Sequence, residues 1–380
     1  MEIVIYMIPF LTALFLLFVF NKKMVWWEYA VLIVPSLLFA FLTQIIMVNI
    51  NASDIEYLGG YINRITYYEP WDEMVLKTKT RTVSDGKGGT RVQTYTVLER
   101  EYHHEKYTYV INDSDWERSL SKKEYETIKK RMGNNSVFRD MNRKYHRIDG
   151  DAYDIYWDKT PEHLYDITHE NLYKNKVKAM QTNTIFKYGN IDKTDAKELG
   201  LYDYPPIQLL NQNPIIGKEV SDTAIQKIKY INATYGKPYQ FRMFILLFED
   251  KDIEISEMQR AYWQNGNKNE FVVCLGVQQD SVIWSNSFSW CDAPNLEVLT
   301  RNYFIENPNL DISKYADYIS EQIPIHWVRK EFEDFNYIKV GLSKGQYIAL
   351  IILMLLINIG ISIFLVKNEI SNENNLGNWN

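Results

Sequence analysis

The sequence predicts a membrane-anchored α+β protein, and three observations support this fold class. Two long apolar runs open the chain, and a third run lies close to its end. The hydrophilic segment between them changes near its middle from strand-like patterns to alternating helices and strands. We therefore expect an N-terminal transmembrane helical hairpin, a β-rich subdomain, an α/β sandwich subdomain and a C-terminal transmembrane helix, over residues 3–48, 50–205, 215–338 and 347–366.

The N-terminal hairpin is inferred from two apolar runs, at residues 3–20 and 24–48, which a short polar turn separates. A helix of 18 residues rises roughly 27 Å, close to the thickness of the hydrocarbon core of a bilayer. A lysine at the membrane centre costs about 2.5–3.5 kcal/mol, so Lys22 and Lys23 are expected in water, between helices at 3–20 and 26–48. Basic turns favour the cytoplasmic side.

A cleaved signal peptide is the alternative interpretation of the first run. Such a peptide carries positive charge before its apolar segment and small residues at a cleavage site after it. Here Glu2 precedes the run, the lysine pair follows it, and no A-x-A pattern is present. The reversed charge order favours a retained anchor with its N-terminus outside.

The third span is predicted at residues 347–366, which carry no charge. An asparagine-rich tail of 14 residues, 367–380, follows it. With three spans and a cytoplasmic lysine turn, residues 49–344 are expected to be periplasmic or extracellular, and the tail cytoplasmic.

The composition excludes some partners of the hydrophilic segment. Without the charges of the first 48 residues and of the tail, 39 basic and 44 acidic side chains remain. This mild acidic balance argues against nucleic acid or an anionic membrane surface as the main partner. The two cysteines, Cys274 and Cys291, exclude a disulfide-built scaffold; whether they pair is left open, since pairing across a hairpin would need a sharp bend.

The first half of the hydrophilic segment is predicted to be mainly β. Glycines at 86, 88 and 89 favour a hairpin turn between two Thr- and Val-rich runs. Ser121 and Glu124 have capping-box spacing, which predicts a helix over 122–132. Residues 162–171 are expected to be irregular, and the type of the element at 175–187 is left open. The predicted strands are 61–68, 74–83, 91–101, 106–111 and 153–157.

The second half is predicted to be an α/β sandwich that begins after the prolines at 205, 206 and 214. Its strand at 241–248 is a continuous apolar run, which is typical of a strand buried on both faces. Ser256 and Gln259 have capping-box spacing and predict a helix that ends at Gly266. The other predicted elements are a helix from Ser221 to Tyr235, strands at 270–277 and 282–290, and helices at 295–306 and 312–322.

The element order over Ser221 to Phe335 resembles the TPM domain of membrane-anchored bacterial and plastid proteins. The segment from Gln259 to Val273, QRAYWQNGNKNEFVV, lies where that family turns from a helix into its central strand. The resemblance implies a membrane-associated accessory or assembly factor; phosphatase activity and calcium binding are reported for some members. The acidic cluster that this chemistry needs is not visible at the matching positions, so neither activity nor metal is carried over.

A calcium site is the sharpest metal hypothesis. Asp149, Asp151 and Asp154 surround Gly150 and offer hard oxygen ligands, although their spacing is not that of an EF-hand. An ordinary solvated turn is the alternative. His103 and His104 are neighbours on a strand and point to opposite faces, which disfavours joint binding of zinc.

The turn after the second-half helix is the candidate ligand or partner surface. Gly266, Asn267, Lys268 and Glu270 converge there just before a central strand. A helix stop with solvated polar residues is the alternative. No nucleophile elbow, phosphate loop or dinucleotide fingerprint is present in the sequence, and no catalytic residue is assigned.

The sequence thus predicts an integral membrane protein of a bacterium or phage, acting through a large extracytoplasmic domain as a binding, assembly or envelope accessory protein. Its expected partners are the lipid bilayer, other membrane or envelope proteins and further copies of itself, but not nucleic acid. One rival is a membrane-anchored metal-dependent hydrolase of phosphatase type, with Asp149, Asp151 and Glu270 as its candidate residues. A subunit of an oligomeric channel or transporter is the other.

Overall fold

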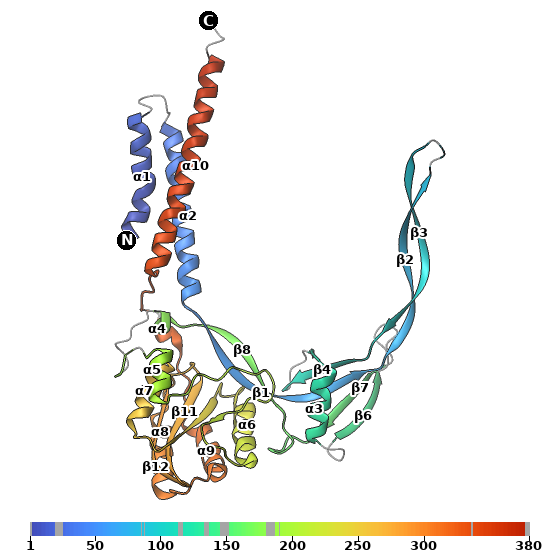
Figure 1. Cartoon of the computed structure of the whole chain (residues 1–380), viewed down its shortest axis with the longest axis vertical. Helices are drawn as coiled ribbons and strands as arrows, with labels where there is room; N and C mark the ends of the chain where they lie inside the picture. Colours follow the sequence, from blue (N-terminus) through green and yellow to red (C-terminus); the bar gives the residue numbers. More distant parts are fainter. Residues whose placement is uncertain are drawn as a thin grey trace. The chain divides into compact units, whose positions relative to one another are not determined.

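The computed structural model describes residues 2–19, 26–84, 86, 88–112, 117–132, 137–144, 152–179, 187–189, 191–335 and 337–376. The chain divides into two compact units, and Figure 1 labels their elements. Unit 1 comprises residues 1–55, 172–183 and 331–380, and unit 2 comprises residues 56–171 and 184–330. The protein is a mixed α+β structure with apolar helices near both ends.

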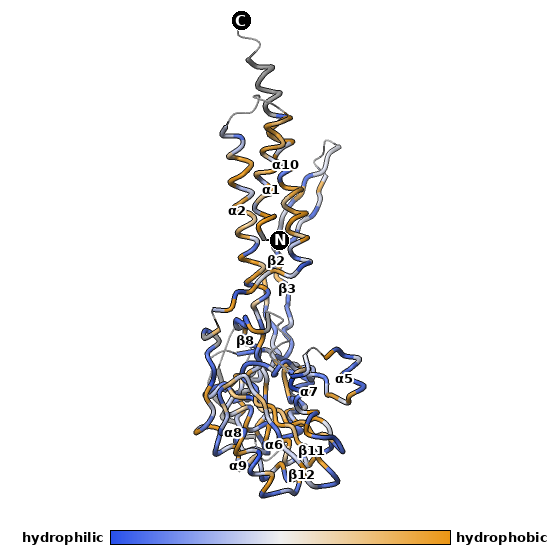
Figure 2. Tube along the Cα trace, turned by 90° about the vertical axis from the view of Figure 1, so that its left-hand side faces the viewer, coloured by the Kyte–Doolittle hydropathy of each residue, from blue (hydrophilic) through white to orange (hydrophobic). Residues whose placement is uncertain are grey.

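Unit 1 is built on three helices: α1 (Glu2–Val19), α2 (Trp26–Asn51) and α10 (Lys344–Leu376). Figure 2 shows their apolar character. Among the described residues, α2 and the segment Lys344–Lys367 of α10 are long and apolar enough to cross a membrane, whereas Ile3–Val19 is a shorter apolar helix. The structure therefore provides two helices of spanning length where the sequence predicted three. Lys22 and Lys23 lie outside the described residues.

The buried contacts define the directions of the three helices. At one end, Ile5 of α1 packs in one cluster with Ala40 of α2 and Leu350 of α10. At the other end, Leu16, Leu32 and Leu365 belong to a second cluster. Helices α1 and α10 therefore run parallel, and α2 runs antiparallel to both. The C-terminal end of α2 meets the N-terminal end of α10, where the amides of Asn51 and Gln346 exchange hydrogen bonds of 2.9 and 2.8 Å.

Polar side chains are buried within this helical bundle. The Asn358 amide nitrogen donates to the carbonyl of Met354 at 2.8 Å, and the Ser362 hydroxyl donates to the carbonyl of Asn358 at 2.6 Å. The Ser36 hydroxyl of α2 donates to Asn358 Oδ1 at 3.4 Å. One buried hydrogen bond thus joins α2 to α10.

The first sheet of unit 2 has six strands in the order β5-β4-β1-β7-β6, with β8 also paired to β1. Helix α3 (Lys122–Met132) begins at the predicted capping box: Ser121 N–H donates to Glu124 Oε2 at 2.8 Å, and Glu124 N–H donates to Ser121 Oγ at 3.2 Å. The strands are β1 (Ser53–Tyr68), β4 (Lys106–Ile111), β5 (Glu117–Leu120), β6 (Val137–Lys144), β7 (Ala152–Trp157) and β8 (Asp166–Lys174).

Strand β8 corrects the prediction that residues 162–171 are irregular. Ile167 and Thr168 are β-branched, but the polar residues from His169 to Asn171 follow them, so no strand pattern continues through the segment. It forms because it lies beside β1, where Ile62 N–H donates to the carbonyl of Tyr165 at 3.0 Å. The following residues, left unassigned from the sequence, include α4 (Lys176–Ala179).

Strands β2 (Trp71–Ser84) and β3 (Thr90–His103) form the predicted hairpin, which we call the ribbon (Figure 1). They pair antiparallel without a break from Trp71↔His103 to Ser84↔Thr90. Alternate residues face opposite sides. The charged face carries Glu73, Lys77, Lys79, Arg81, Arg91, Glu99 and Glu101. The other, which we call the Thr/Leu face, carries Asp72, Met74, Leu76, Thr78, Thr80, Thr82, Ser84, Thr90, Val92, Thr94, Thr96, Leu98, Arg100 and Tyr102.

The second sheet of unit 2 has the order β12-β11-β10-β9. Strands β9, β10 and β11 are parallel, and β12 is antiparallel to β11. The bounds are β9 (Ile215–Ile216), β10 (Arg242–Glu249), β11 (Glu270–Gln278), β12 (Ser281–Ser289), α5 (Lys193–Leu199), α6 (Asp222–Tyr235), α7 (Glu254–Tyr262), α8 (Pro294–Glu306) and α9 (Ile312–His326), with a short 3-10 turn at Phe332–Phe335.

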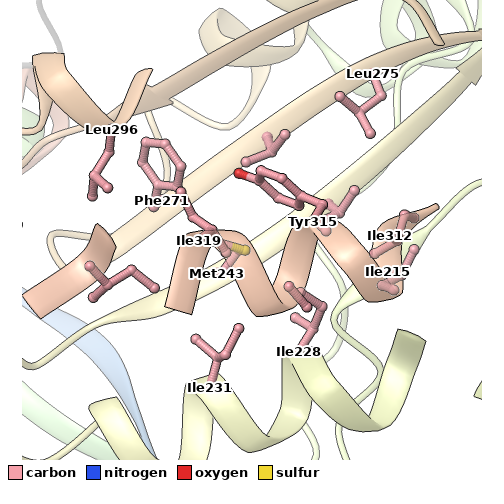
Figure 3. Close-up of a cluster of buried hydrophobic side chains, with 14 of the residues drawn as sticks. Ile215, Ile228, Ile231, Met243, Phe271, Leu275, Leu296, Ile312, Tyr315 and Ile319 are labelled. Carbon is pink, nitrogen blue, oxygen red and sulfur yellow. The ribbon is translucent and has the colours of Figure 1, made fainter. Parts of the chain in front are cut away.

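Strand β10 is buried on both faces, as its apolar run predicted. Met243, Ile245 and Leu247 pack with residues of α6, α8 and α9, and Figure 3 shows this core. Phe244 and Phe248 belong to a second cluster on the other face, which includes residues of α5 and α7. From Ser221 onward the helices and strands follow the predicted order, whereas α5 and β9 were not predicted, and α5 lies within the segment 50–205 that was predicted as β-rich.

Two details of this region differ from the sequence prediction or complete it. Helix α7 begins at Glu254 rather than at Ser256 and ends at Tyr262 rather than at Gly266, and Gln259 is not a capping residue. Instead, the Gln259 amide accepts from Tyr202 N–H at 2.8 Å and donates to the Tyr202 carbonyl at 2.9 Å, which joins α7 to the preceding segment. Cys274 and Cys291 are both free and buried.

Candidate functional site

The proposed calcium ligands are only partly described. Asp149 and Asp151 lie outside the described residues. Asp154 lies on β7, is buried, and accepts a hydrogen bond of 2.7 Å from the Thr66 hydroxyl of β1. No group of three or more metal-ligating side chains occurs in the part of the chain that the structure describes. Calcium binding therefore stays a prediction, with Asp154 already engaged inside the sheet.

The adjacent histidines, His103 and His104, contact aromatic side chains at the base of the ribbon. The His103 ring stacks on Trp71 with 4.3 Å between the ring centroids, and its Nε2 lies 3.1 Å from Glu73 Oε1. The His104 ring contacts the edge of Tyr102 at 5.0 Å. Each histidine thus has its own aromatic neighbour.

The residues of the predicted ligand turn come together, but below the surface. Glu270 is fully buried, and Asn267 and Lys268 are nearly so. The Glu270 carboxylate accepts from Asn267 N–H at 2.8 Å and also from the Tyr204 hydroxyl. Gly266 precedes it with φ of 74°, and a Cβ at this glycine would meet Glu270 Oε2 at 2.9 Å. The Glu270 carboxylate therefore accepts its hydrogen bonds from neighbouring residues of the protein. A ligand or partner surface at this turn stays a prediction.

Burial controls the protonation of the neighbouring phenol. Burial first, and the Glu270 carboxylate second, hold the pKa of Tyr204 well above its usual value. Tyr204 is therefore a neutral donor at physiological pH. Arg242, the register partner of Glu270 on β10, is also buried and lies over the Phe244 ring at 4.9 Å.

A pocket that the sequence did not reveal lies beside a row of four tyrosines. Tyr67 on β1 is the direct partner of Tyr107 on β4 and of Tyr153 on β7. The ring of Tyr67 stacks with those of Tyr107 and Tyr153, at centroid distances of 5.0 and 6.4 Å. Tyr125 of α3 extends the row, 4.4 Å from Tyr107. Three strands and one helix, distant in sequence, thus build one aromatic wall.

This tyrosine pocket has a volume of about 390 Å³, within the range of small-molecule sites. Tyrosine hydroxyls, two carboxylates, one ammonium group and an aliphatic side chain surround it, which is a mixture of hydrogen-bonding and apolar groups. The lining residues are Tyr67, Glu69, Tyr107, Tyr125, Glu126, Lys129, Tyr153 and Ile155.

Glu105 organises the hydroxyls at the edge of the pocket. Its carboxylate accepts from the hydroxyls of Tyr67 and Tyr107, each at 3.3 Å, and from Lys122 Nζ at 2.5 Å. The hydrogen bond from Lys122 lowers the pKa of Glu105. Burial, and then the charge of Glu105, raise the pKa of both tyrosines. The two phenols therefore stay protonated at neutral pH.

The chemistry of the pocket fits a polar, hydroxyl-bearing ligand. Glu69 and Glu126 can accept hydrogen bonds from such a ligand, and Lys129 can donate one. The tyrosine rings and Ile155 offer apolar contact to a carbon skeleton. Sequence reasoning missed the site because it found the three strands without their pairing, and only the pairing aligns Tyr67, Tyr107 and Tyr153.

Comparisons of the chain with protein-family models, with curated proteins and with solved structures found no match.

Proposed function

We propose that this chain is an integral membrane protein in which α1, α2 and α10 lie in the bilayer and residues 49–344 form an extracytoplasmic binding domain. The observation that carries the proposal is the exposed apolar surface of the bundle. Phe18 is 79% exposed, Phe15 64%, Leu356 62% and Ile363 63%. Leaving one such side chain in water forgoes roughly 1.5–3 kcal/mol, whereas hydrocarbon accepts it readily.

The helix directions support the topology. Ile5, Asn51 and Gln346 lie near one end of the bundle, by the contacts of α1, α2 and α10 described above. In a bilayer, this arrangement sends the N-terminus and the hydrophilic segment to one side and the tail to the other. The lysine pair between α1 and α2 favours the cytoplasm for the opposite end.

Anchoring is tested by extraction and by cysteine labelling. The full chain should stay in the membrane pellet at alkaline carbonate pH and dissolve only in detergent. A membrane-impermeant maleimide should label Arg81→Cys, on the exposed charged face of the ribbon, in intact cells, and Asn380→Cys only after permeabilisation. The buried native cysteines keep the background low. Carbonate release would overturn anchoring, and inverted labelling would overturn the topology.

The tyrosine pocket is the proposed ligand site, and its ligand is a mono- or disaccharide. The supporting observation is the lining of phenols, carboxylates and one ammonium group, which matches the hydroxyls and the apolar ring face of a sugar. Envelope carbohydrates would be available on the extracytoplasmic side.

Neighbouring lysines on α3 provide the test of the pocket. Lys129 lines it and Lys130 does not, although both are exposed. The full chain in nanodiscs is titrated with a panel of saccharides, and binding is measured by calorimetry. Lys129→Gln should weaken binding about tenfold through loss of a charged hydrogen bond, and Lys130→Gln should leave it unchanged. Absence of any saccharide binding, or equal effects of both variants, would remove the ligand proposal without affecting anchoring.

We also propose that residues 221–335 form a TPM-like domain. The support is the element order α6, β10, α7, β11, β12, α8 and α9, together with the glycine turn at Gly266 before β11. An experimental structure tests this proposal: the strand order β12-β11-β10-β9 should superpose on that of TPM domains, and a different order in that family would contradict it.

A further inference from the structure

The ribbon distributes charge and exposure in an unusual way. Opposite charges on its charged face form ion pairs with each other: Lys77 pairs with Glu101 at 3.0 Å, and Lys79 pairs with Glu99. These pairs shelter the side chains between them, and Val75 and Val97 on this face are half-buried. The charged face therefore needs no partner.

The Thr/Leu face shows the opposite behaviour. Every residue on it is exposed, including its apolar members: Val92 is 71%, Leu76 67%, Met74 60% and Leu98 58% exposed. In soluble proteins, the apolar residues of an antiparallel strand usually lie on the face that packs against the core. The exposure marks this face as an interaction surface.

The ribbon is a sheet of two strands. Among the described residues, β2 and β3 pair only with each other. An isolated two-stranded hairpin is marginally stable in water, and independent stability takes a third strand or a packed face. A partner on the Thr/Leu face would supply that packing.

The charge of the Thr/Leu face restricts the occupant. Its formal charges are those of Asp72 and Arg100, which bind each other, with Arg100 Nε 3.2 Å from Asp72 Oδ1. Such a face offers nothing to nucleic acid or to a charged peptide, but it complements another flat, uncharged sheet face. We propose that it packs against the Thr/Leu face of a second copy of this chain.

The order of residues along the ribbon sets the register of this dimer. Apolar side chains gather near its base, with Leu76 directly opposite Leu98, and threonines follow toward the tip in the rows Thr78↔Thr96 and Thr80↔Thr94. Only a base-to-base arrangement lays leucine on leucine and threonine on threonine. A two-fold axis along the ribbon produces it and places β2 of one copy over β3 of the other.

The area predicts the strength of the contact. Fourteen residues span roughly 46 Å and two strands about 10 Å, so two faces cover about 900 Å² together. Stable interfaces in solution bury about 1,200–2,000 Å². The dimer should therefore be weak in dilute detergent and populated in the bilayer, where confinement raises the effective concentration. In this respect the inference rests on the proposed membrane anchoring.

Cross-linking in native membranes tests the proposal with adjacent positions on opposite faces. Thr80 lies on the Thr/Leu face and Arg81 on the charged face, and both are exposed. A short bismaleimide should join two copies of the Thr80→Cys chain and should not join copies of the Arg81→Cys chain. Equal cross-linking at both positions, or none at either, would overturn the proposal, and so would Thr80→Cys capturing another membrane protein instead of itself.

Charge variants show whether the contact is specific. In the Thr80→Cys background, Thr94→Glu puts like charges into the interface and should lower dimer yield about tenfold. Gln93→Glu adds the same charge to the other face and should leave the yield unchanged. Mixing Thr94→Glu copies with Thr94→Lys copies should restore it, which an unfolded variant would not do. Unchanged yield with Thr94→Glu would contradict the dimer, and carbonate extraction reports on anchoring independently.

Discussion

Glu270 is buried although three asparagines, a lysine and a glycine directly precede it in the sequence. From Asn265 to Glu270 the chain reads as a solvated loop, yet Asn269 and Glu270 are fully inaccessible to water. A carboxylate can be buried when hydrogen bonds replace its hydration, and here Asn267 and Tyr204 provide them. Because these hydrogen bonds replace water, the stability of the turn should depend on small changes in the chemistry of residue 270.

Glu270→Gln is expected to destabilise unit 2 by about 1–3 kcal/mol, because an amide hydrogen then faces buried donors. Thermal unfolding followed by tryptophan fluorescence measures the loss. Glu254→Gln, at an exposed position on α7, is the matched control and should change stability by less than about 0.5 kcal/mol. Loss of ligand binding in Glu270→Gln with unchanged stability would favour the ligand interpretation of the turn.

The cysteines make a second prediction at this scale. Burial raises the pKa of the Cys291 thiol to about 11 and that of Cys274 further. At pH 8 roughly one Cys291 thiol in a thousand is ionised, and only the thiolate reacts. A disulfide reagent should therefore detect no thiol in the folded chain at pH 8 and both after denaturation.

The control for this measurement is Arg81→Cys, whose exposed thiol on the charged face of the ribbon should react within the mixing time. Reactivity of Cys291 should rise as the pH approaches 11. A native cysteine that reacts at pH 8 as fast as the introduced one would show that the site is open.

At the scale of elements, β1 joins the two sheets of unit 2 through a contact that only glycines permit. A Cβ at Gly59 would lie 2.1 Å from the carbonyl oxygen of Asn232 in α6, and a Cβ at Gly236 would lie 2.0 Å from the carbonyl oxygen of Gly59. Backbone atoms cannot rotate away as side chains do, so the close approach fixes β1 against the end of α6.

Gly59→Ala is expected to destabilise unit 2 by about 1–3 kcal/mol or more, since the added methyl must displace backbone. Gly60→Ala is the neighbouring comparison, because its Cβ would meet side-chain atoms of Asn112 and Ile111 at 3.2 Å, and these can yield. Denaturant unfolding should rank Gly59→Ala as clearly less stable than Gly60→Ala. The reverse ranking would contradict the close packing.

At the scale of the whole molecule, the proposed membrane anchoring would give α1, α2 and α10 a different solvent from the hydrophilic segment. Apolar side chains such as Phe15 and Ile363 lie on the outside of the bundle, while polar Asn358 and Ser36 lie inside. This distribution is inverted relative to the hydrophilic segment, whose sheets bury their apolar residues. In the proposed bilayer location, packing and hydrogen bonds would replace the hydrophobic effect between the helices.

Asn358→Ala is accordingly expected to weaken the bundle by about 1 kcal/mol, through loss of the hydrogen bond to Ser36. Unfolding by dodecyl sulfate in bicelles measures it. Ile359→Ala, at the adjacent and 52% exposed position, should have little effect in lipid. A larger effect of Ile359→Ala would indicate that this surface is covered by protein.

The sequence by itself determined features that depend on neighbouring residues. The apolar runs predicted helices, Ser121 and Glu124 predicted the start of α3, and the glycines near residue 86 predicted the hairpin. The buried strand at residues 241–248 followed from its unbroken apolar run. In each case the physical cause, such as backbone capping, turn conformation or continuous hydrophobicity, lies within a few residues of its effect.

Only the tertiary structure decided what depends on distant pairing. It made a strand of the polar residues in β8, aligned Tyr67 with Tyr107 and Tyr153, and diverted Gln259 from capping to the backbone of Tyr202. It also buried Glu270 while leaving Leu76 and Leu98 exposed. Hydrophobicity and propensity assign a residue a preference, but the partner that satisfies the preference comes from elsewhere in the chain, and one sequence read locally does not contain that pairing.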